Sequence, residues 1–166
     1  MSMNKNVITN SLMDKILLSE SSKHLKETEK RKIKAELIAF FKKAKLYEYA
    51  GKKCFSTENC FDLEDYRLDL KPTIDWEWDT NEIYLFEEIV GTEIKESLTY
   101  AIECIESLLI KSYSDNSFCI EASVQLGDPN SINIRIYLFN GSFYADVDIE
   151  DYNQPVLRMV INPGGL

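Results

Sequence analysis

The sequence has little of what most catalytic and metal-binding sites need. It contains a single histidine, His24, and its four cysteines are irregularly spaced, with no Cys-x-x-Cys pair. Zinc sites are usually built from Cys and His at short, regular spacings, so we predict no metal site. The GxSxG, HExxH, P-loop and GxGxxG motifs are also absent. We therefore expect a protein that is not an enzyme and that needs no cofactor.

Long apolar runs are absent as well. The longest, at residues 37–41, falls far short of the ~18 apolar residues that cross a bilayer. Residues 1–15 lack the apolar stretch and the small-residue cleavage site of a secretory signal. We expect a cytoplasmic protein with no membrane contact, in which the cysteines are free thiols. A redox pair of Cys54 and Cys60 stays open as an alternative.

Basic residues are almost absent from the last two-thirds of the chain. Residues 1–57 carry thirteen Lys or Arg against six acids, whereas residues 58–90 carry eleven acids against two bases, and residues 91–166 eleven acids against four bases. The net charge of −9 therefore combines a basic first third with a strongly acidic remainder. Such asymmetry bears on association with charged partners rather than on fold.

Three stretches have the apolar spacing of helices. Residues 10–19 and 22–50 repeat apolar side chains every three or four positions, and Gly51 suits the end of the second helix. Residues 92–112 have the clearest helical period, with an apolar stripe from Ile94 to Leu109. We predict two N-terminal helices and one central helix.

The segment between these helices is harder to interpret. In IDWEWD, residues 74–79, apolar and acidic side chains alternate, which predicts a strand with its tryptophans inward and its carboxylates outward. Residues 79–81 could cap a helix over 82–90, but EIYLF at 82–86 would equally serve as a strand. Both structures stay open for residues 82–90.

The C-terminal part has the period of strands. Residues 118–126 and 131–139 alternate in hydrophobicity, and residues 155–162 supply a last strand. Asn140-Gly141 favours a type I′ hairpin turn, which would pair Phe139 with Ser142 and Arg135 with Asp146. We therefore predict antiparallel strands over 117–162.

These elements predict an α+β fold. The N-terminal helices and the central helix would pack on one face of a C-terminal antiparallel meander sheet. We expect one domain over 1–166, with a basic helical part (1–51), an acidic middle (58–90), a helix (92–112) and strands (117–162). No repeat or linker divides the chain, and 166 residues suffice for one core.

Acidic and aromatic residues gather on two of the predicted strands. On the outer face of the hairpin, two tyrosines would lie opposite each other among acids that include Glu150. Tyrosine provides contact area at a small entropic cost, and acids attract a basic partner. A solvated sheet face is the alternative interpretation. The predicted partner-binding residues are Asp75, Glu77, Asp79, Glu121, Tyr137, Tyr144, Asp146 and Asp148.

Other functions are open at this stage. Paired carboxylates in a cleft would suit a hydrolase, and a sheet edge or the basic helix would suit an adaptor or an oligomeric scaffold. The basic helix over 22–50 could contact phosphates, but the acidic body would repel nucleic acid, so we expect no nucleic-acid partner.

The acidic body over 58–166, the segment IDWEWDTNE and the segment RIYLFNGSFYADVDIED together resemble bacterial toxin-immunity proteins of contact-dependent inhibition or polymorphic toxin systems. The resemblance is to the class, which shares no motif, so no residue role is carried over. It implies a small, acidic, catalytically silent cytoplasmic inhibitor that binds and neutralises a basic partner protein, such as a toxin nuclease.

Overall fold

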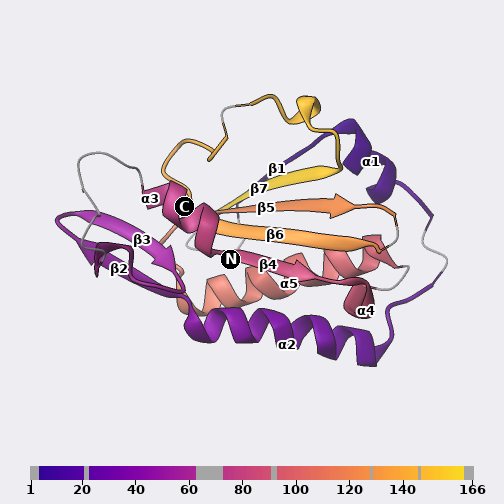
Figure 1. Cartoon of the computed structure of the whole chain (residues 1–166), viewed down its shortest axis with the longest axis horizontal. Helices are drawn as coiled ribbons and strands as arrows, with labels where there is room; N and C mark the ends of the chain where they lie inside the picture. Colours follow the sequence, from indigo (N-terminus) through magenta and orange to yellow (C-terminus); the bar gives the residue numbers. More distant parts are fainter. Residues whose placement is uncertain are drawn as a thin grey trace.

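The computed structural model describes residues 4–20, 23–62, 73–90, 93–127, 129–145 and 147–162. Helices and strands are interspersed along the chain (Figure 1). They are β1 (Asn4–Thr9), α1 (Ser11–Leu17), α2 (Glu27–Lys43), β2 (Lys45–Tyr49), β3 (Lys52–Ser56), α3 (Thr73–Thr80), β4 (Glu82–Leu85), α4 (Glu87–Val90), α5 (Ile94–Ser112), β5 (Phe118–Gln125), β6 (Ser131–Leu138) and β7 (Val156–Asn162), with 3-10 turns η1 (Cys60–Asp62) and η2 (Ile149–Asp151).

The main sheet has five strands in the order β1-β7-β5-β6-β4, and every neighbouring pair is antiparallel. A second sheet consists of β2 and β3 alone. The predicted α+β class is confirmed, and so are the strands now seen as β5, β6 and β7. Strand β1 had no counterpart in the prediction, because its six residues are too few to show a clear period.

The hydrophobic core lies between the main sheet and the helices. Figure 1 shows α2 and α5 side by side along one face of the sheet. Alternate residues of β6, namely Ile132, Ile134 and Ile136, are fully buried against this layer. The buried stripes of both helices complete the core. The clear 3.6-residue period of residues 92–112 thus correctly predicted the helix α5.

The first two helices begin at side-chain caps. The Asn10 side chain accepts a hydrogen bond from the Met13 backbone N–H, which starts α1. The Glu29 carboxylate accepts one from the Lys26 N–H at the start of α2. No helix in the described part of the chain is both long and apolar enough to cross a membrane.

The prediction of one helix over residues 22–50 was wrong at its end. Helix α2 ends at Lys43, and a β-hairpin of β2 and β3 follows. Its turn is formed by Ala50 and Gly51, both with positive φ (51° and 77°). Gly51 therefore makes a hairpin turn and does not end a helix. The stretch KLYEY mixes Lys, Leu and Glu, which favour a helix, with Tyr, which favours a strand, so the residue types alone did not reveal β2.

In residues 74–90, a helix stands where a strand was predicted, and a strand stands where a helix was one of two predicted structures. Residues 74–79 lie in the helix α3, so the predicted strand was wrong. The alternative strand over 82–86 was correct, since β4 pairs with β6. Of the helix considered for residues 82–90, the structure has the short α4 at the end of this range.

The predicted hairpin at Asn140-Gly141 does not form. Strand β6 ends at Leu138, and Arg135 lies opposite Glu82 and Glu121 in the register rather than opposite Asp146. Position 146 itself lies outside the described residues. The expected place for the returning strand is occupied by β4 and α3, so the chain leaves the sheet after β6. We call residues 139–155 the strap.

Candidate functional site

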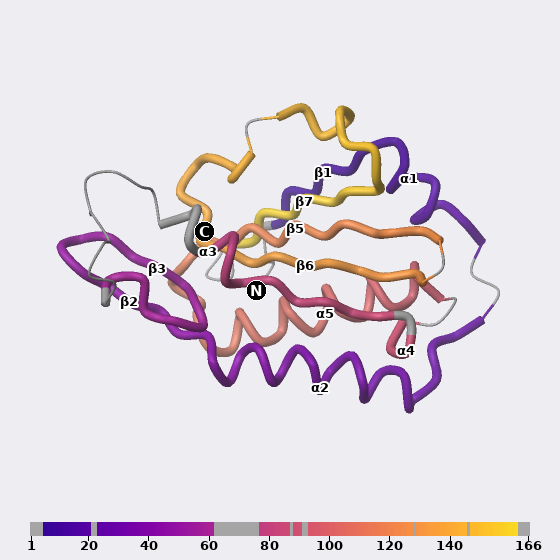
Figure 2. The backbone as a smooth tube through the Cα atoms, viewed as in Figure 1, coloured from indigo at the N-terminus to yellow at the C-terminus, as the bar shows by residue number. Residues whose placement is uncertain are grey.

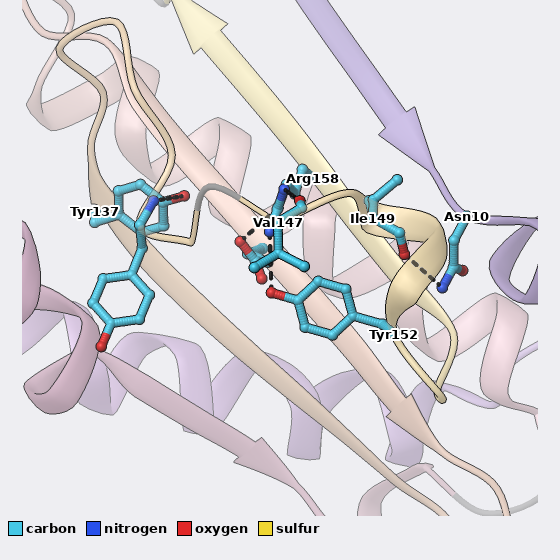
Figure 3. A network of polar contacts seen from close by, with 8 residues as sticks. Asn10, Tyr137, Val147, Ile149, Tyr152 and Arg158 are labelled. Carbon is cyan, nitrogen blue, oxygen red and sulfur yellow. Dashed lines mark hydrogen bonds and ion pairs between the residues drawn. The ribbon is translucent and has the colours of Figure 1, made fainter.

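The strap crosses the sheet face that is turned away from α2 and α5. In Figure 2 it is the orange segment that leaves β6 and returns into β7 on the side opposite those helices. Charged and aromatic side chains lie between the strap and the sheet (Figure 3). This layer explains why both faces of β5 are buried, although an antiparallel strand usually exposes one.

A buried ion pair lies at the centre of this layer. The register places Glu121 of β5 opposite Arg158 of β7 on one side and opposite Arg135 of β6 on the other. Arg158 Nε donates to Glu121 Oε2 at 3.0 Å, and the two side chains are only 5% and 6% exposed. Burial raises the pKa of the Glu121 carboxyl, and the Arg158 guanidinium opposes that shift. The Glu121 charge is therefore satisfied inside the protein.

Arg158 also holds the middle of the strap. Its guanidinium donates to the Val147 carbonyl at 3.3 Å and to the Tyr152 hydroxyl at 3.1 Å, as Figure 3 shows. It lies over the Phe143 ring, 5.2 Å from the ring centre. One side chain thus contacts three points of the strap.

A second anchor holds the end of the strap that leads into β7. Asn10 Nδ2 donates to the Ile149 carbonyl at 3.4 Å, as Figure 3 shows. It also donates to the Gln154 carbonyl at 2.8 Å. The Glu150 carboxylate accepts hydrogen bonds from the Ser11 backbone N–H and hydroxyl, at 2.9 and 2.8 Å. The strap is therefore tied to the start of α1 as well as to the sheet.

An aromatic cluster fixes the other end of the strap. The Trp78 ring of α3 stacks on the Tyr144 ring, with centroids 4.2 Å apart and planes 6° from parallel. Arg135 lies 4.6 Å from the centre of the Trp78 ring and donates to Glu82 at 2.7 Å and to the Trp78 carbonyl. This cluster joins α3, β4, β6 and the strap.

A small cavity of about 150 Å³ lies in this layer. Trp78, Tyr152 and Val156 contribute its apolar and aromatic lining, while Glu121, Arg135 and Asn133 contribute polar groups. Each of these three polar side chains already has a partner within the protein. These three side chains are therefore satisfied without a ligand.

Helix α3 and Asn81, the residue directly after it, bridge the two sheets through two side chains one turn apart. The Glu77 carboxylate accepts hydrogen bonds from the backbone N–H groups of Phe55 in β3, at 2.5 Å, and of Leu138 in β6. Asn81 Nδ2 donates to the carbonyls of Phe55 at 2.5 Å and of Ile136 at 2.9 Å. Strand β4 pairs with residues 132–135 of β6. Beyond them, the Ile136 carbonyl and the Leu138 N–H bond to Asn81 and Glu77, in the place where a neighbouring strand would bond.

The environment of Glu77 changes its titration. Burial raises the pKa of the Glu77 carboxyl to about 8, although the hydrogen bonds from the Phe55 and Leu138 amides act in the opposite direction. Burial also raises the pKa of the neighbouring Cys54 and Cys60 thiols, so both stay neutral beside Glu77. Glu77 is therefore a buried group that ionises near neutral pH.

This shift predicts that stability falls as the pH rises. The Glu77 carboxyl would ionise near pH 4.5 in the unfolded chain but near pH 8 in the folded one, so over this window the folded state holds more protons. We expect the free energy of unfolding to fall by at most about 1.4 kcal/mol per pH unit from this group. Urea unfolding at pH 5.5 and pH 8 measures the change.

Glu77→Gln provides the control for this prediction, because glutamine keeps the shape of the side chain and does not titrate. The difference in unfolding free energy between the two pH values should be smaller in Glu77→Gln than in the wild type. Equal differences in both proteins would exclude Glu77 as the cause.

The predicted partner-binding residues separate into three groups. The expectation of outward acids and two exposed tyrosines was wrong for Glu77, Glu121 and Tyr137, which are at most 5% exposed. Asp79 and Asp148 are exposed, and Tyr144 is half-buried. The side chain of Asp75 and the whole of Asp146 lie outside the described residues.

The buried members of the predicted set contact one another. The Tyr137 hydroxyl hydrogen-bonds to the Glu121 and Cys119 side chains and accepts from the Tyr144 N–H at 3.4 Å. The prediction missed Arg158, although its sequence context contains a signal. Arg158 is the single charge in the apolar strand β7, and Glu121 is the single charge, of opposite sign, in β5.

The described residues contain no group of three His, Cys, Asp or Glu side chains that could hold a metal ion. Cys54 and Cys60 hydrogen-bond to each other through their side chains, and both are fully buried free thiols. Burial raises the pKa of both, which keeps them in the unreactive thiol form. The two residues therefore lie close enough to pair, but neither is in the thiolate form that a redox pair needs.

Comparison of the chain with protein-family models, with curated proteins and with solved structures found no match in any of the three.

Proposed function

We propose that this protein is a toxin-immunity type inhibitor, which binds a basic partner protein through the outer surface of the strap and the adjoining end of α3. The strap carries four acids and no basic residue. Of these acids, Asp148, Glu150 and Asp151 are exposed. The observation that carries the proposal is that the strap is fixed to the protein on its inner side and exposes these acids on its outer side.

The position of these charges supports binding. The Asp148 carboxylate accepts a hydrogen bond from the Glu150 N–H at 3.0 Å, and Glu150 is tied to Ser11. Such bonds leave further acceptor positions on each carboxylate while limiting its motion. A partner would therefore meet carboxylates that are already ordered, and less conformational entropy would be lost on binding.

An apolar contact is available among these acids. Val147 is 49% exposed although its carbonyl is held by Arg158. Asp79 is exposed next to Trp78, whose ring stacks on Tyr144 of the strap, so α3 extends the acidic surface. Binding surfaces commonly combine such a central apolar anchor with charges around it. The interior residues Glu121, Tyr137 and Glu77 would then support the surface without touching the partner.

The proposal predicts that this protein rescues growth from its toxic partner and that its acids speed association with that partner. The product of the gene immediately upstream would be expressed alone and together with this protein, and growth would be scored. We expect toxicity when the upstream product is expressed alone and recovery of growth on co-expression.

Reversal of two charges in Asp148→Lys/Asp151→Lys should lower the association rate by about tenfold at low salt, because fewer acids attract the partner. Stopped-flow measurements at several salt concentrations test this.

Glu103→Lys/Asp115→Lys is the matched control, since it changes the net charge equally at two exposed positions outside the strap and α3. This variant should slow association much less. An equal effect of both double variants would show that only the net charge matters, and the strap would then lose its role. Absence of toxicity, or of recovery, would contradict the inhibitor function itself.

A second candidate function, an oligomeric scaffold, is favoured by the outer strand β1 of the main sheet. Val7 and Ile8 of this strand are 49% and 37% exposed. Exposed apolar residues on edge strands promote pairing between chains. Light scattering that shows a stable homo-oligomer would support this function.

A further inference from the structure

At the outer edge of β4, the backbone pairs with no other described strand. Strand β4 ends the sheet order and pairs with β6 alone among the described strands. The Phe139 N–H bonds to the Ser117 carbonyl, so odd-numbered residues at this end of β6 direct their backbone groups toward β5. Even-numbered residues of β6 then bond to Ile83 and Leu85. The N–H and C=O groups of Glu82 and Tyr84 consequently point away from the sheet.

A groove of about 470 Å³ runs along this edge, between β4 and α2. Its α2 wall includes Ala39 and Phe40, and residues 57, 58 and 80 also line it. On the β4 side, Tyr84 and Phe86 are 44% and 58% exposed and stack on each other, with centroids 5.7 Å apart. There is thus open space beside this edge of β4, with apolar surface on both sides.

The charged groups that line the groove are mostly acidic. Among the described residues of the lining, the acids are Glu36, Glu58 and Glu82, and the base is Lys43. Glu82 is ion-paired with Arg135 at 2.7 Å, so it adds little negative charge to the groove, and the attraction for a cation comes mainly from the other acids. A second copy of this chain paired at the same edge would bring the two acidic sets together, which opposes self-association. A cationic segment is favoured by the same charges.

We propose that this edge binds an extended basic segment of the partner protein as an additional β-strand. The inference rests on the proposed function for the basic nature of the partner. Glu82 and Tyr84 would exchange main-chain hydrogen bonds with the segment. Side chains on one face of it would pack on Ala39 and Phe40, and those on the other face would meet Tyr84 and Phe86. Lys or Arg beside the apolar positions would be attracted by Glu36.

The probe for this site is a fluorescein-labelled synthetic peptide of alternating Val and Lys, with alternating Val and Glu as its control. We expect the Val–Lys peptide to bind, measured by fluorescence anisotropy, and the Val–Glu peptide not to bind. In hydrogen exchange, the Tyr84 amide of the wild-type protein should exchange at least about tenfold more slowly with the Val–Lys peptide bound. If the exchange rate of the Tyr84 amide in the wild-type protein is unchanged with the Val–Lys peptide present, the inference is wrong.

A proline variant isolates the backbone bond. Tyr84→Pro removes an N–H that points out of the sheet, and edge strands tolerate proline at such positions. Tyr84→Val keeps that N–H and also lacks the ring. The proline variant should bind the peptide about tenfold more weakly than the valine variant. Equal affinities in two folded variants, checked by circular dichroism, would overturn the proposal.

Two further outcomes identify where a failure lies. If light scattering shows a dimer, and the Glu82 and Tyr84 amides are protected without peptide, a second copy occupies the edge and the inference is wrong. If the Val–Lys peptide fails to bind while co-expression still rescues growth, the inference fails and the inhibitor function stands. Peptide binding without rescue would support the edge site and contradict the proposed function.

Discussion

An Arg158→Met variant is expected to lose about 3–5 kcal/mol of its free energy of unfolding, because removal of one partner leaves the other charge buried. The Glu121 carboxylate would remain only 6% exposed with no cation bonded to it. The strap would also lose the hydrogen bonds from Arg158 to Val147 and Tyr152. Urea unfolding followed by circular dichroism gives the loss, and hydrogen exchange shows whether strap amides open first.

Two variants serve as controls for this expectation. Arg135→Met removes an arginine whose ion pair with Glu82 is more accessible, with side chains 19% and 23% exposed, so its loss should be smaller. Glu121→Met/Arg158→Met removes both charges and should recover much of the stability lost in the single variant. A single variant as stable as the wild type would show that the strap does not depend on this ion pair.

Asn81→Ala should lower the free energy of unfolding by about 2–4 kcal/mol, because two buried carbonyl groups would lose their hydrogen bonds. The carbonyls of Phe55 and Ile136 receive their bonds from the Asn81 side chain, which is fully buried. The measurement is again urea unfolding, together with exchange of the β2–β3 amides.

Asp79→Ala is the matched control at the adjoining end of α3, since Asp79 is exposed. Exposed substitutions of this kind usually change stability by less than about 0.5 kcal/mol. A loss of the same size in both variants would show that alanine at this end of α3 acts on the helix itself. The bridging role of Asn81 would then be refuted.

The sequence predicted the elements whose period is long and regular. Helix α5 and strands β5, β6 and β7 each combine a consistent pattern with a buried face. Strands β2 and β3 follow α2 after a single residue and are rich in lysine, so local preference could not separate them from the helix. In α3, six alternating residues fit a strand, yet its helical form places Glu77 and Asn81 one turn apart on the same side.

Tertiary pairing decided the parts of the candidate site that the sequence could not predict. Asn140-Gly141 has the composition of a tight hairpin, but the neighbouring edge of β6 is occupied by β4 at residues 132–135 and by Glu77 and Asn81 beyond them. The strap therefore covers the other face of the sheet, and Glu121 and Tyr137 become interior. Asp79 and Asp148 are exposed as expected, because nothing in the described structure covers them.

The bridge made by α3 and Asn81 has a consequence for how the molecule unfolds. The β2–β3 hairpin packs on the core through Phe55, but the hydrogen bonds that join its backbone to the main sheet run through Glu77 and Asn81. Cooperativity between hairpin and sheet is thus concentrated in two side chains rather than spread along a shared strand. Loss of both would divide one folding unit into two, and the hairpin would then melt before the five-stranded sheet.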